Sequence, residues 1–257
     1  MKGMGMGELT GEIALVTGSS RGIGAAIATL FAQQGAAVAV HGRDADAAAS
    51  VVKNIEGAGG RAVPVLADLT RYQEIEAMRT AIERSLGPVS VLVANAGGNP
   101  VRPGPVEEIP EDGWQASLEA NLTTTFLTIK AFLPGMKERH RGTIVTMSSA
   151  ASRRPTVMSP TAYAAAKAGI EVLTRQVAAQ AGPAGVRASC LAPETILTER
   201  NRAQIPSAVQ EQLRDAHPVR RLGTPEDVAQ AALFLASDRS SWISGITVDV
   251  AGGSVLS

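Results

Sequence analysis

Short apolar runs alternate with longer helical stretches along the 257-residue chain. Continuously apolar, β-branched runs are typical of strands that are covered on both faces, and parallel strands need a helix or another long crossover between them. The expected strands are 12–16, 38–40, 61–66, 89–94, 143–147, 186–191 and 246–250, and the expected helices are 25–34, 44–58, 72–86, 114–138, 161–181 and 225–235. This alternation predicts an α/β fold in which a doubly wound parallel sheet of about seven strands carries helices on both faces.

Nothing in the sequence divides the chain into parts. It has neither an internal repeat nor a linker, and its length is normal for one α/β unit, so we predict a single domain over 1–257. The alternation breaks down only at 194–218, a polar, proline-containing stretch that follows an expected strand. Ligands of open α/β sheets bind beyond the carboxyl ends of strands. This stretch is therefore a candidate substrate lid, and an ordinary surface segment without a role in substrate binding is an equally good interpretation.

The composition argues against several classes of protein. Lys plus Arg and Asp plus Glu both total 24, so the charge gives no reason to expect binding to nucleic acid or to a membrane surface. No apolar run reaches the roughly 18 residues that cross a bilayer, and residues 1–10 lack the apolar core of a signal peptide. The single cysteine, Cys190, fits a reducing compartment, and the three histidines lack metal-ligand spacing. We expect a cytoplasmic protein without a metal site.

A glycine-rich turn lies between the first expected strand and the first expected helix. It reads Thr17-Gly-Ser-Ser-Arg-Gly-Ile-Gly24. Glycines let the backbone pass close to a pyrophosphate, and the free N–H groups at the helix start face its negative charge. Three glycines are a weak signal alone, but strand, glycine-rich turn and helix in this order form the Rossmann-like dinucleotide-binding unit.

Tyr163 and Lys167 lie four residues apart in an alanine-rich stretch that favours helix, which places them on one helix face. An ammonium beside a phenol favours the phenolate, so we expect Lys167 to lower the pKa of Tyr163 from its usual value of about 10. Such a tyrosine can exchange protons near neutral pH. A lone pair of this kind is more often an ordinary helix face, so its meaning depends on the rest of the chain.

Together with several other motifs, these features resemble the classical short-chain dehydrogenases/reductases. The other motifs are Asp68 after the third expected strand, Asn95-Ala96-Gly97 after the fourth, Asn121 in the long helix, Ser149 after the fifth, Pro193 with Thr198, and the stretch 249–253. They follow the family's order over nearly the whole chain. The likeness is greatest to the 3-oxoacyl-thioester (acyl-carrier-protein) reductases, and it implies a homotetramer.

The resemblance implies that a hydride passes between a nicotinamide and a carbonyl/alcohol pair. In the reducing direction Tyr163 would donate a proton as general acid, and Ser149 would hold the carbonyl oxygen as negative charge develops. Lys167 would lower the pKa of Tyr163 and bind the nicotinamide ribose, and Asn121 would hold a water that connects Lys167 to solvent. Ser148 and Ser149 end a strand and point to opposite faces. The family pattern favours Ser149 as the active serine.

The resemblance also assigns cofactor-binding residues. They are Gly18, Ser20, Arg21, Ile23, Gly24, Arg43, Asp68, Leu69, Asn95, Ala96, Gly97, Tyr163, Lys167, Pro193, Ile196 and Thr198. Gly42 stands where members that prefer NAD usually carry an acid, and Arg43 and Arg21 offer guanidinium groups that match a phosphate. We therefore expect NADP(H). In the opposing interpretation Asp44 binds the ribose of NAD(H), whereas we interpret Asp44 as the cap of the following helix.

Two places depart from the family pattern or extend it. The family usually reads Pro-Gly where this chain has Pro193-Glu194, and glutamate adds bulk and charge beside the expected nicotinamide site. Arg153 and Arg154 lie in the segment that typically borders the substrate. They would recognise a carboxylate or phosphate of the substrate, or they would be ordinary solvated arginines.

The substrate class is left open by the sequence. A 3-oxoacyl thioester or a related ketone is the first expectation, although Ala184 replaces a residue associated with docking of acyl carrier protein, and only Arg139 and Arg141 could supply part of a basic patch. The alternatives are an NAD-dependent dehydrogenase of a small alcohol, sugar or polyol, and a non-catalytic dinucleotide-binding sensor. The presence of all four candidate catalytic groups argues against the sensor.

Overall fold

The computed structural model describes residues 7–154 and 159–256. Within them, seven strands form one parallel sheet: β1 (Ile13–Val16), β2 (Ala37–Gly42), β3 (Arg61–Leu66), β4 (Val91–Ala94), β5 (Gly142–Met147), β6 (Val186–Pro193) and β7 (Thr247–Val250). Their order across the sheet is β3-β2-β1-β4-β5-β6-β7, and every neighbouring pair is parallel. The predicted α/β fold with about seven strands is confirmed. The strand order reverses its direction between β1 and β4, which is where ligands of such sheets bind.

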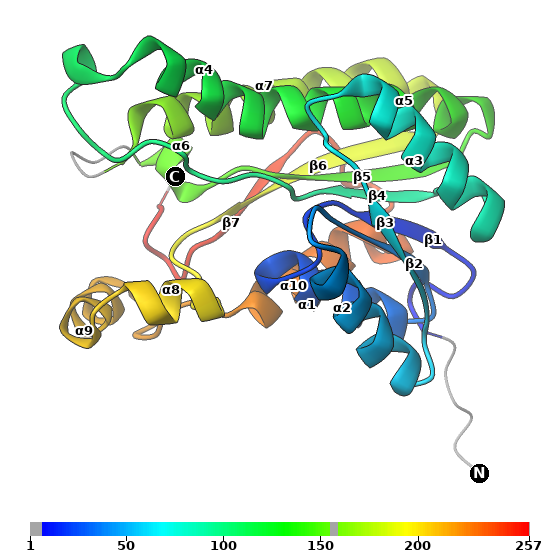
Figure 1. Ribbon diagram of the computed structural model, residues 1–257, viewed down its shortest axis with the longest axis horizontal. Helices are drawn as coiled ribbons and strands as arrows, with labels where there is room; N and C mark the ends of the chain where they lie inside the picture. Colours follow the sequence, from blue (N-terminus) through cyan, green and yellow to red (C-terminus); the bar gives the residue numbers. More distant parts are fainter. Residues whose placement is uncertain (1–6, 155–158, 257) are drawn as a thin grey trace.

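Helices cover both faces of the sheet (Figure 1). One layer holds α1 (Gly22–Gln33), α2 (Ala45–Gly57) and α10 (Pro225–Ala236), and the other holds α3 (Tyr72–Ser85), α4 (Glu111–Leu118), α5 (Thr124–Glu138) and α7 (Thr161–Ala181). Three shorter helices follow the carboxyl ends of strands: α6 (Ala150–Arg153) after β5, and α8 (Glu199–Gln204) and α9 (Ser207–Ala216) after β6. The predicted helices on both faces are therefore present.

Local sequence explains where two of these helices begin. The carboxylate of Asp44 accepts a hydrogen bond from the N–H of Ala47 at 3.0 Å, so Asp44 is the N-cap of α2, as predicted. Thr224 and Asp227 form a capping box around Pro225, the first residue of α10. These caps satisfy N–H groups that lack partners within the helix.

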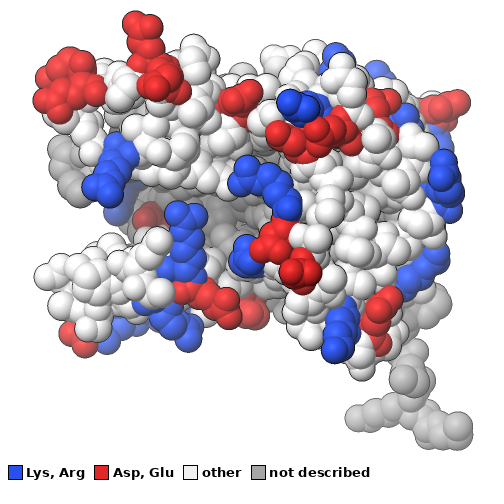
Figure 2. Space-filling model, in the orientation of Figure 1, with Lys and Arg blue, Asp and Glu red and all other residues white. Residues whose placement is uncertain are grey.

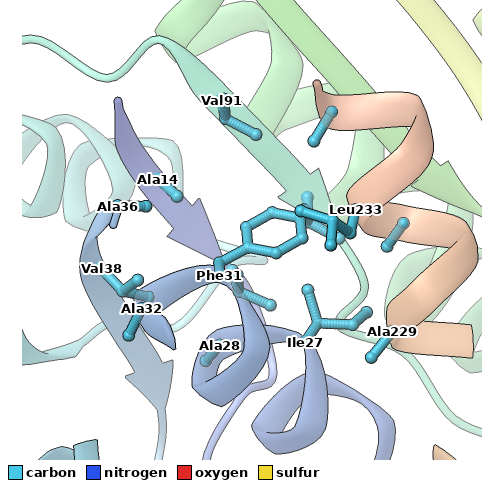
Figure 3. Close-up of a cluster of buried hydrophobic side chains, with 14 of the residues drawn as sticks. Ala14, Ile27, Ala28, Phe31, Ala32, Ala36, Val38, Val91, Ala229 and Leu233 are labelled. Atoms are coloured by element: carbon cyan, nitrogen blue, oxygen red, sulfur yellow. The ribbon is translucent and has the colours of Figure 1, made fainter. Parts of the chain in front are cut away.

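The sheet separates two hydrophobic cores. In one of them, Phe31 and Ile27 of α1 pack against Leu233 of α10 above β1 and β4 (Figure 3). The other core lies between the sheet and the helices α3, α5 and α7. Successive strand residues enter opposite cores, as Leu15 and Val16 do, because side chains alternate across a strand. Strands buried on both faces explain why their sequences are continuously apolar.

The structure differs from the sequence prediction in two segments. The expected helix 114–138 is interrupted, because α4 and α5 are joined by a π-helical turn, Glu119–Thr123. The hydroxyls of Thr124 and Thr125, the first residues of α5, donate to the carbonyl oxygen of Asn121 in that turn at 3.1 and 2.8 Å. The stretch 194–218, in which the alternation of strands and helices was expected to break down, contains two helices that the sequence did not predict, α8 and α9.

Candidate active site

The glycine-rich turn between β1 and α1 is held against the end of β4. Gly18 has a φ angle of +64°, which favours glycine. A Cβ atom on Gly24 would lie 2.3 Å from the carbonyl oxygen of Gly18 and 2.7 Å from Nδ2 of Asn95, so no side chain fits there. That nitrogen of Asn95 donates to the carbonyl oxygens of Thr17 and Gly18 at 3.0 and 3.2 Å. Two of the segments predicted to bind the cofactor are thus tied together.

His41, in β2, holds the same turn from the other side. The side chain is buried, its Nδ1 accepts a hydrogen bond from the N–H of Gly18 at 3.0 Å, and its Nε2 lies 3.1 Å from the carbonyl oxygen of Ala67. An accepting Nδ1 carries no proton, so Nε2 is the donor and the ring is neutral. Burial lowers the pKa of His41, which favours the same state. Sequence reasoning gave this residue no role, because its partners are backbone groups of distant segments and leave no pattern around it.

Two adjoining hollows run along the carboxyl ends of the strands. Their volumes are about 670 and about 390 Å³, and Arg21, Gly97 and Gly98 line both. Every residue predicted to bind the cofactor lines at least one of them. Those that line the larger hollow are Gly18, Ser20, Arg21, Arg43, Asp68, Leu69, Ala96 and Gly97. Those that line the smaller hollow are Arg21, Ile23, Gly24, Asn95, Gly97, Tyr163, Lys167, Pro193, Ile196 and Thr198. Figure 2 shows the molecule hollowed between the layer with α4 and α7 and the segment with α8 and α9.

Three arginines surround the larger hollow. Arg21 forms an ion pair with Asp44 at 2.5 Å, Arg43 follows β2, and Arg200 comes from α8. Arg200 was not predicted, because its place in the chain gives no sign that α8 returns to this edge of the sheet. A Cβ atom on Gly42 would lie 2.9 Å from Oγ of Ser20. The hydroxyl of Ser20 therefore occupies the space into which an acidic side chain at position 42 would extend.

Ser149, Tyr163 and Lys167 meet at the smaller hollow. The hydroxyl of Tyr163, in the first turn of α7, is hydrogen-bonded to Ser149 at the end of β5. Lys167 lies one turn further along α7 and is buried. Its Nζ donates to the carbonyl oxygen of Met147 at 2.8 Å and lies 5.4 Å from the centre of the Tyr163 ring. The structure thus brings together three of the four predicted catalytic residues.

Asn121 lies directly behind this group, in the π-helical turn. Its Oδ1 accepts from the N–H of Gly98 at 3.1 Å, and its Nδ2 donates to the carbonyl oxygens of Gly98 and Ser117 at 2.7 and 2.9 Å. A Cβ atom on Gly97 would lie 2.6 Å from Oδ1 of Asn121 and 3.3 Å from Nζ of Lys167. Asn121 therefore fixes the loop after β4 against Lys167. A water held by Asn121 stays a prediction.

The pKa expected for Tyr163 is wrong for this structure. Burial raises the pKa of Tyr163, and the hydrogen bond from Ser149 offsets only part of that increase. Burial also lowers the pKa of Lys167 to about 8. The physical reason is that Lys167 is buried and Tyr163 only partly exposed, so loss of contact with water disfavours the charged form of each.

The two adjacent serines have separate surroundings. Oγ of Ser148 is buried, 2.8 Å from Oε1 of Glu171 and 3.0 Å from the carbonyl oxygen of Lys167. Both serines line the smaller hollow, but only Ser149 is hydrogen-bonded to Tyr163. Strand alternation predicted this division, and Ser149 is the serine that can reach a ligand of the hollow.

For Arg153 both interpretations are wrong, and Arg154 fits the solvated one in part, because it is exposed. Arg153 forms ion pairs with Glu171 at 3.3 Å and with Asp249 at 2.8 Å, and its side chain is only 24% exposed. Arg154 donates from Nη1 to the carbonyl oxygen of Ser254 at 2.8 Å. The guanidinium group of Arg153 is thus neither solvated nor available to a substrate, because partners from α7 and β7 bind it, whereas Arg154 is exposed and is tied to the segment after β7.

The arginines considered for carrier-protein docking also have internal partners. Arg141 pairs with Glu12, and Arg139 donates from Nη2 to the carbonyl oxygen of Val89 at 2.9 Å. Both precede β5, whereas the hollows lie beyond its carboxyl end. Arg139 and Arg141 therefore lie at the opposite edge of the sheet from the site.

Two further features of the described residues concern metal ligands and membrane-spanning helices. No group of three or more His, Cys, Asp or Glu side chains in 7–154 and 159–256 is placed to hold a metal ion. Among the helices of this same part of the chain, none is long and apolar enough to cross a membrane.

A parallel sheet with a glycine-rich turn at its switch point and a Ser-Tyr-Lys group beside it defines a nicotinamide-dependent oxidoreductase of alcohols and ketones. Residues 18–254 match the family described as Enoyl-(Acyl carrier protein) reductase. The chain belongs to the short-chain dehydrogenase/reductase family, as the sequence motifs implied.

Two curated relatives cover nearly the whole chain. It is 36% identical over 248 residues to the 7alpha-hydroxysteroid dehydrogenase of Escherichia coli (strain K12), with 96% of each chain covered. It is 34% identical over 252 residues to the 3-oxoacyl-[acyl-carrier-protein] reductase of Thermotoga maritima, with 97% of this chain and 100% of the relative covered.

Two solved structures of similar proteins hold different cofactors. A 7α-hydroxysteroid dehydrogenase complexed with NADH and 7-oxo glycochenodeoxycholic acid superposes with a TM-score of 0.91 at 36% identity, covering 97% of this chain and 96% of that one. A gluconate 5-dehydrogenase of Burkholderia cenocepacia in complex with NADP and tartrate gives a TM-score of 0.89 at 32% identity, with 96% of each chain covered. Proteins of this likeness thus use either nicotinamide dinucleotide.

Proposed function

We propose that this protein is an NADP(H)-dependent reductase of a carbonyl substrate, either a 3-oxoacyl thioester or a related ketone. The observation that carries the proposal is the hydrogen bond between Ser149 and Tyr163 at the hollow that Lys167 also lines. The tight contact at Gly24 supports a cofactor beside this group, because it lets the backbone approach a pyrophosphate closely. The likeness to the 3-oxoacyl-[acyl-carrier-protein] reductase of Thermotoga maritima supports the substrate class.

The nicotinamide supplies the hydride when it is bound, and the side chains handle the proton and the charge. The Tyr163 hydroxyl donates its proton to the carbonyl oxygen, and a raised pKa keeps that proton in place until the oxygen becomes basic. Ser149 donates a hydrogen bond to the same oxygen and stabilises its developing charge. Lys167 binds the ribose and stabilises the phenolate left on Tyr163, and Asn121 connects Lys167 to solvent through a water.

The choice of NADP(H) is supported by guanidinium groups at the larger hollow rather than by a net positive charge. Arg21, Arg43 and Arg200 line it together with three acidic residues, Asp44, Asp68 and Glu119, and Ser20 fills the space of an acid at position 42. A 2′-phosphate adds negative charge that these guanidinium groups attract, so Arg43→Ala should raise the KM for NADPH by about tenfold and leave that for NADH nearly unchanged. Arg84→Ala, at the far end of α3, is the matched control. A wild-type kcat/KM that strongly favours NADH refutes this part of the proposal.

The catalytic assignment is tested with Tyr163→Phe, which keeps the ring and removes the proton donor. NADPH consumption with a good ketone should fall by about 10²-fold or more, while NADPH binding measured by fluorescence is retained. Equal turnover by the variant and the wild type would remove Tyr163 from the mechanism. A wild-type protein that binds NADPH and reduces no carbonyl across a panel of ketones, thioesters, quinones and sugars supports the sensor instead.

An NAD-dependent dehydrogenase of a small alcohol, sugar or polyol is the second candidate. Asp44 favours it, because its carboxylate lines the larger hollow beside Arg21 and could accept hydrogen bonds from a ribose. The likeness to a 7α-hydroxysteroid dehydrogenase complexed with NADH also supports it. Asp44→Asn separates the candidates: it should raise the KM for NAD⁺ if Asp44 binds the ribose, and change both that KM and the stability of α2 little if Asp44 is only a cap, because asparagine caps a helix about as well.

We further propose that the chain forms one cytoplasmic domain that assembles as a homotetramer, with 194–218 as a substrate lid. Trp242, 99% exposed, and the half-exposed Phe126 and Val172 support assembly, because large apolar side chains of this kind are often covered by another subunit. The lid is supported by Asn201 and Ile205, which line the smaller hollow. Light scattering tests the tetramer, and protease protection of 194–218 by NADPH tests the lid.

A further inference from the structure

The charges around the smaller hollow are unevenly distributed. In the part of the chain that the structure describes, the charged side chains that line it are Arg21, Lys167 and Glu194. Arg21 is shared with the larger hollow and pairs with Asp44, and Lys167 is buried with its ammonium on the carbonyl oxygen of Met147. Glu194 is therefore the one charged residue of the smaller hollow, among the described residues, that neither lines the larger hollow nor belongs to the Ser149-Tyr163-Lys167 group.

The carboxylate of Glu194 is held in place from behind. Oγ of Ser254 donates to Oε2 of Glu194 at 3.2 Å, and the backbone N–H of Glu194 donates to the carbonyl oxygen of Val250 at 3.2 Å. Ser254 is itself fixed, because its carbonyl oxygen accepts the hydrogen bond from Arg154. Among the described residues no arginine or lysine forms an ion pair with Glu194, so its negative charge is not neutralised by a neighbour.

We propose that Glu194 determines substrate specificity: it admits carbonyl compounds that are uncharged around the reacting carbon and rejects those with a carboxylate or phosphate there. This inference rests on the proposed reductase function and names its substrate class. Two negative charges within a hollow of about 390 Å³ lie close together, and a protein wall screens their repulsion less than water does. Ser254 is a positioning residue that keeps the carboxylate at the wall. The arginines that could have attracted an anion, Arg153 and Arg154, are bound elsewhere.

The test compares two ketones that differ by one charge, methyl acetoacetate and acetoacetate. The wild-type kcat/KM should be about tenfold or more higher for the ester. Glu194→Gln keeps the size of the side chain and removes its charge, so it should bring the two values within about threefold of each other, mainly by raising that for acetoacetate. Glu194→Asp retains the charge and should retain the preference. Glu199→Gln removes a charge from exposed α8 without touching either hollow and serves as the control.

Ser254→Ala tests the positioning role. It should lower the ester preference part of the way toward that of Glu194→Gln, whereas Ser241→Ala, at an exposed serine far from the site, should not change it. A preference that survives Glu194→Gln overturns the inference, as does a wild-type protein that reduces both ketones equally. If the ratio holds but NADH is the better cofactor, only the proposed cofactor is wrong.

A binding measurement keeps the inference testable if the variants do not fold or if no ketone is reduced. Acetamide and acetate have the same shape and differ by one charge. Calorimetry on wild-type protein loaded with NADP⁺ should show acetamide binding about tenfold or more tighter than acetate. Equal binding, or tighter binding of acetate, overturns the proposed role of Glu194 independently of catalysis.

Discussion

Replacing His41 tests whether the dinucleotide-binding turn depends on a neutral, buried imidazole. His41→Leu fills similar space but leaves the N–H of Gly18 and the carbonyl oxygen of Ala67 without their partner. A buried backbone group without a partner costs about 1–3 kcal/mol. We therefore expect the free energy of unfolding, measured in urea at about pH 7, to fall by about 2–5 kcal/mol for this variant. His41→Gln offers one acceptor and one donor in similar positions and should lose less.

The pH dependence gives a second, sharper readout of the same residue. Burial holds the pKa of His41 below its ordinary value of 6.5, so the unfolded chain takes up a proton before the folded one does. The stability that results is present above about pH 6.5 and is lost as the pH falls. The loss amounts to at most about 2 kcal/mol at about pH 5, because each pH unit is worth about 1.36 kcal/mol. His41→Gln does not titrate, so its stability should fall less between about pH 7 and about pH 5.

Cofactor binding completes this test. The Gly18 N–H is part of the turn beside the proposed pyrophosphate site, so His41→Leu should weaken NADPH binding by about tenfold or more, and His41→Gln by less. Acid-dependent stability that is identical in the wild type and His41→Gln would refute the assignment of the neutral ring. Unchanged NADPH binding in His41→Leu would refute the link between this histidine and the turn.

Three further predictions concern the residues around Tyr163. Ser149→Ala should lower kcat by about 10²-fold with little change in stability. Ser148→Ala should chiefly lower the free energy of unfolding, by about 1–3 kcal/mol, because it removes a buried partner of Glu171. Steady-state kinetics and urea unfolding distinguish the two variants. Arg153→Ala should destabilise the fold by about 2–4 kcal/mol, since it leaves two carboxylates unpaired, and a loss below that of an exposed pair would contradict the ion-pair network. Lys167→Met should abolish turnover yet raise the melting temperature at about pH 7, because a buried, charged lysine whose pKa is lowered to about 8 destabilises the folded state. This increase in melting temperature over the wild type should shrink at higher pH, where the wild-type lysine loses its proton.

The motifs with fixed spacing could be predicted from the sequence, and the contacts between distant segments could not. Tyr163 and Lys167 share a helix face, and strand alternation separated Ser148 from Ser149. Arg200 reaches the site only because α8 folds back to it, and His41 contacts Gly18 and Ala67 only because three separate segments meet there. Their partners lie far away in the chain, so no local pattern distinguishes them from an ordinary strand histidine or a surface arginine.

The pKa of Tyr163 and the arginines of the loop show a second limit. Spacing places an ammonium beside a phenol, but the sign of the pKa shift depends on how completely both are shielded from water. The sequence around Arg153 and Arg154 likewise gives no sign of Asp249 or Ser254, which approach from about a hundred residues away. Charge in a sequence can be counted, but its neutralisation depends on the fold.

The π-helical turn between α4 and α5 makes the length of this segment more restrictive than its composition. A regular α-helix advances each residue by about 100°, so one residue removed from Glu119–Thr123 would rotate α4 relative to α5 by about that angle. The shortened helix would regain regular hydrogen bonds while Asn121 turned away from Gly98 and Lys167. A deletion in this turn would therefore improve the hydrogen bonding of the helix and disrupt the site. We expect relatives of this chain to differ in the residue types of the turn but to keep its length.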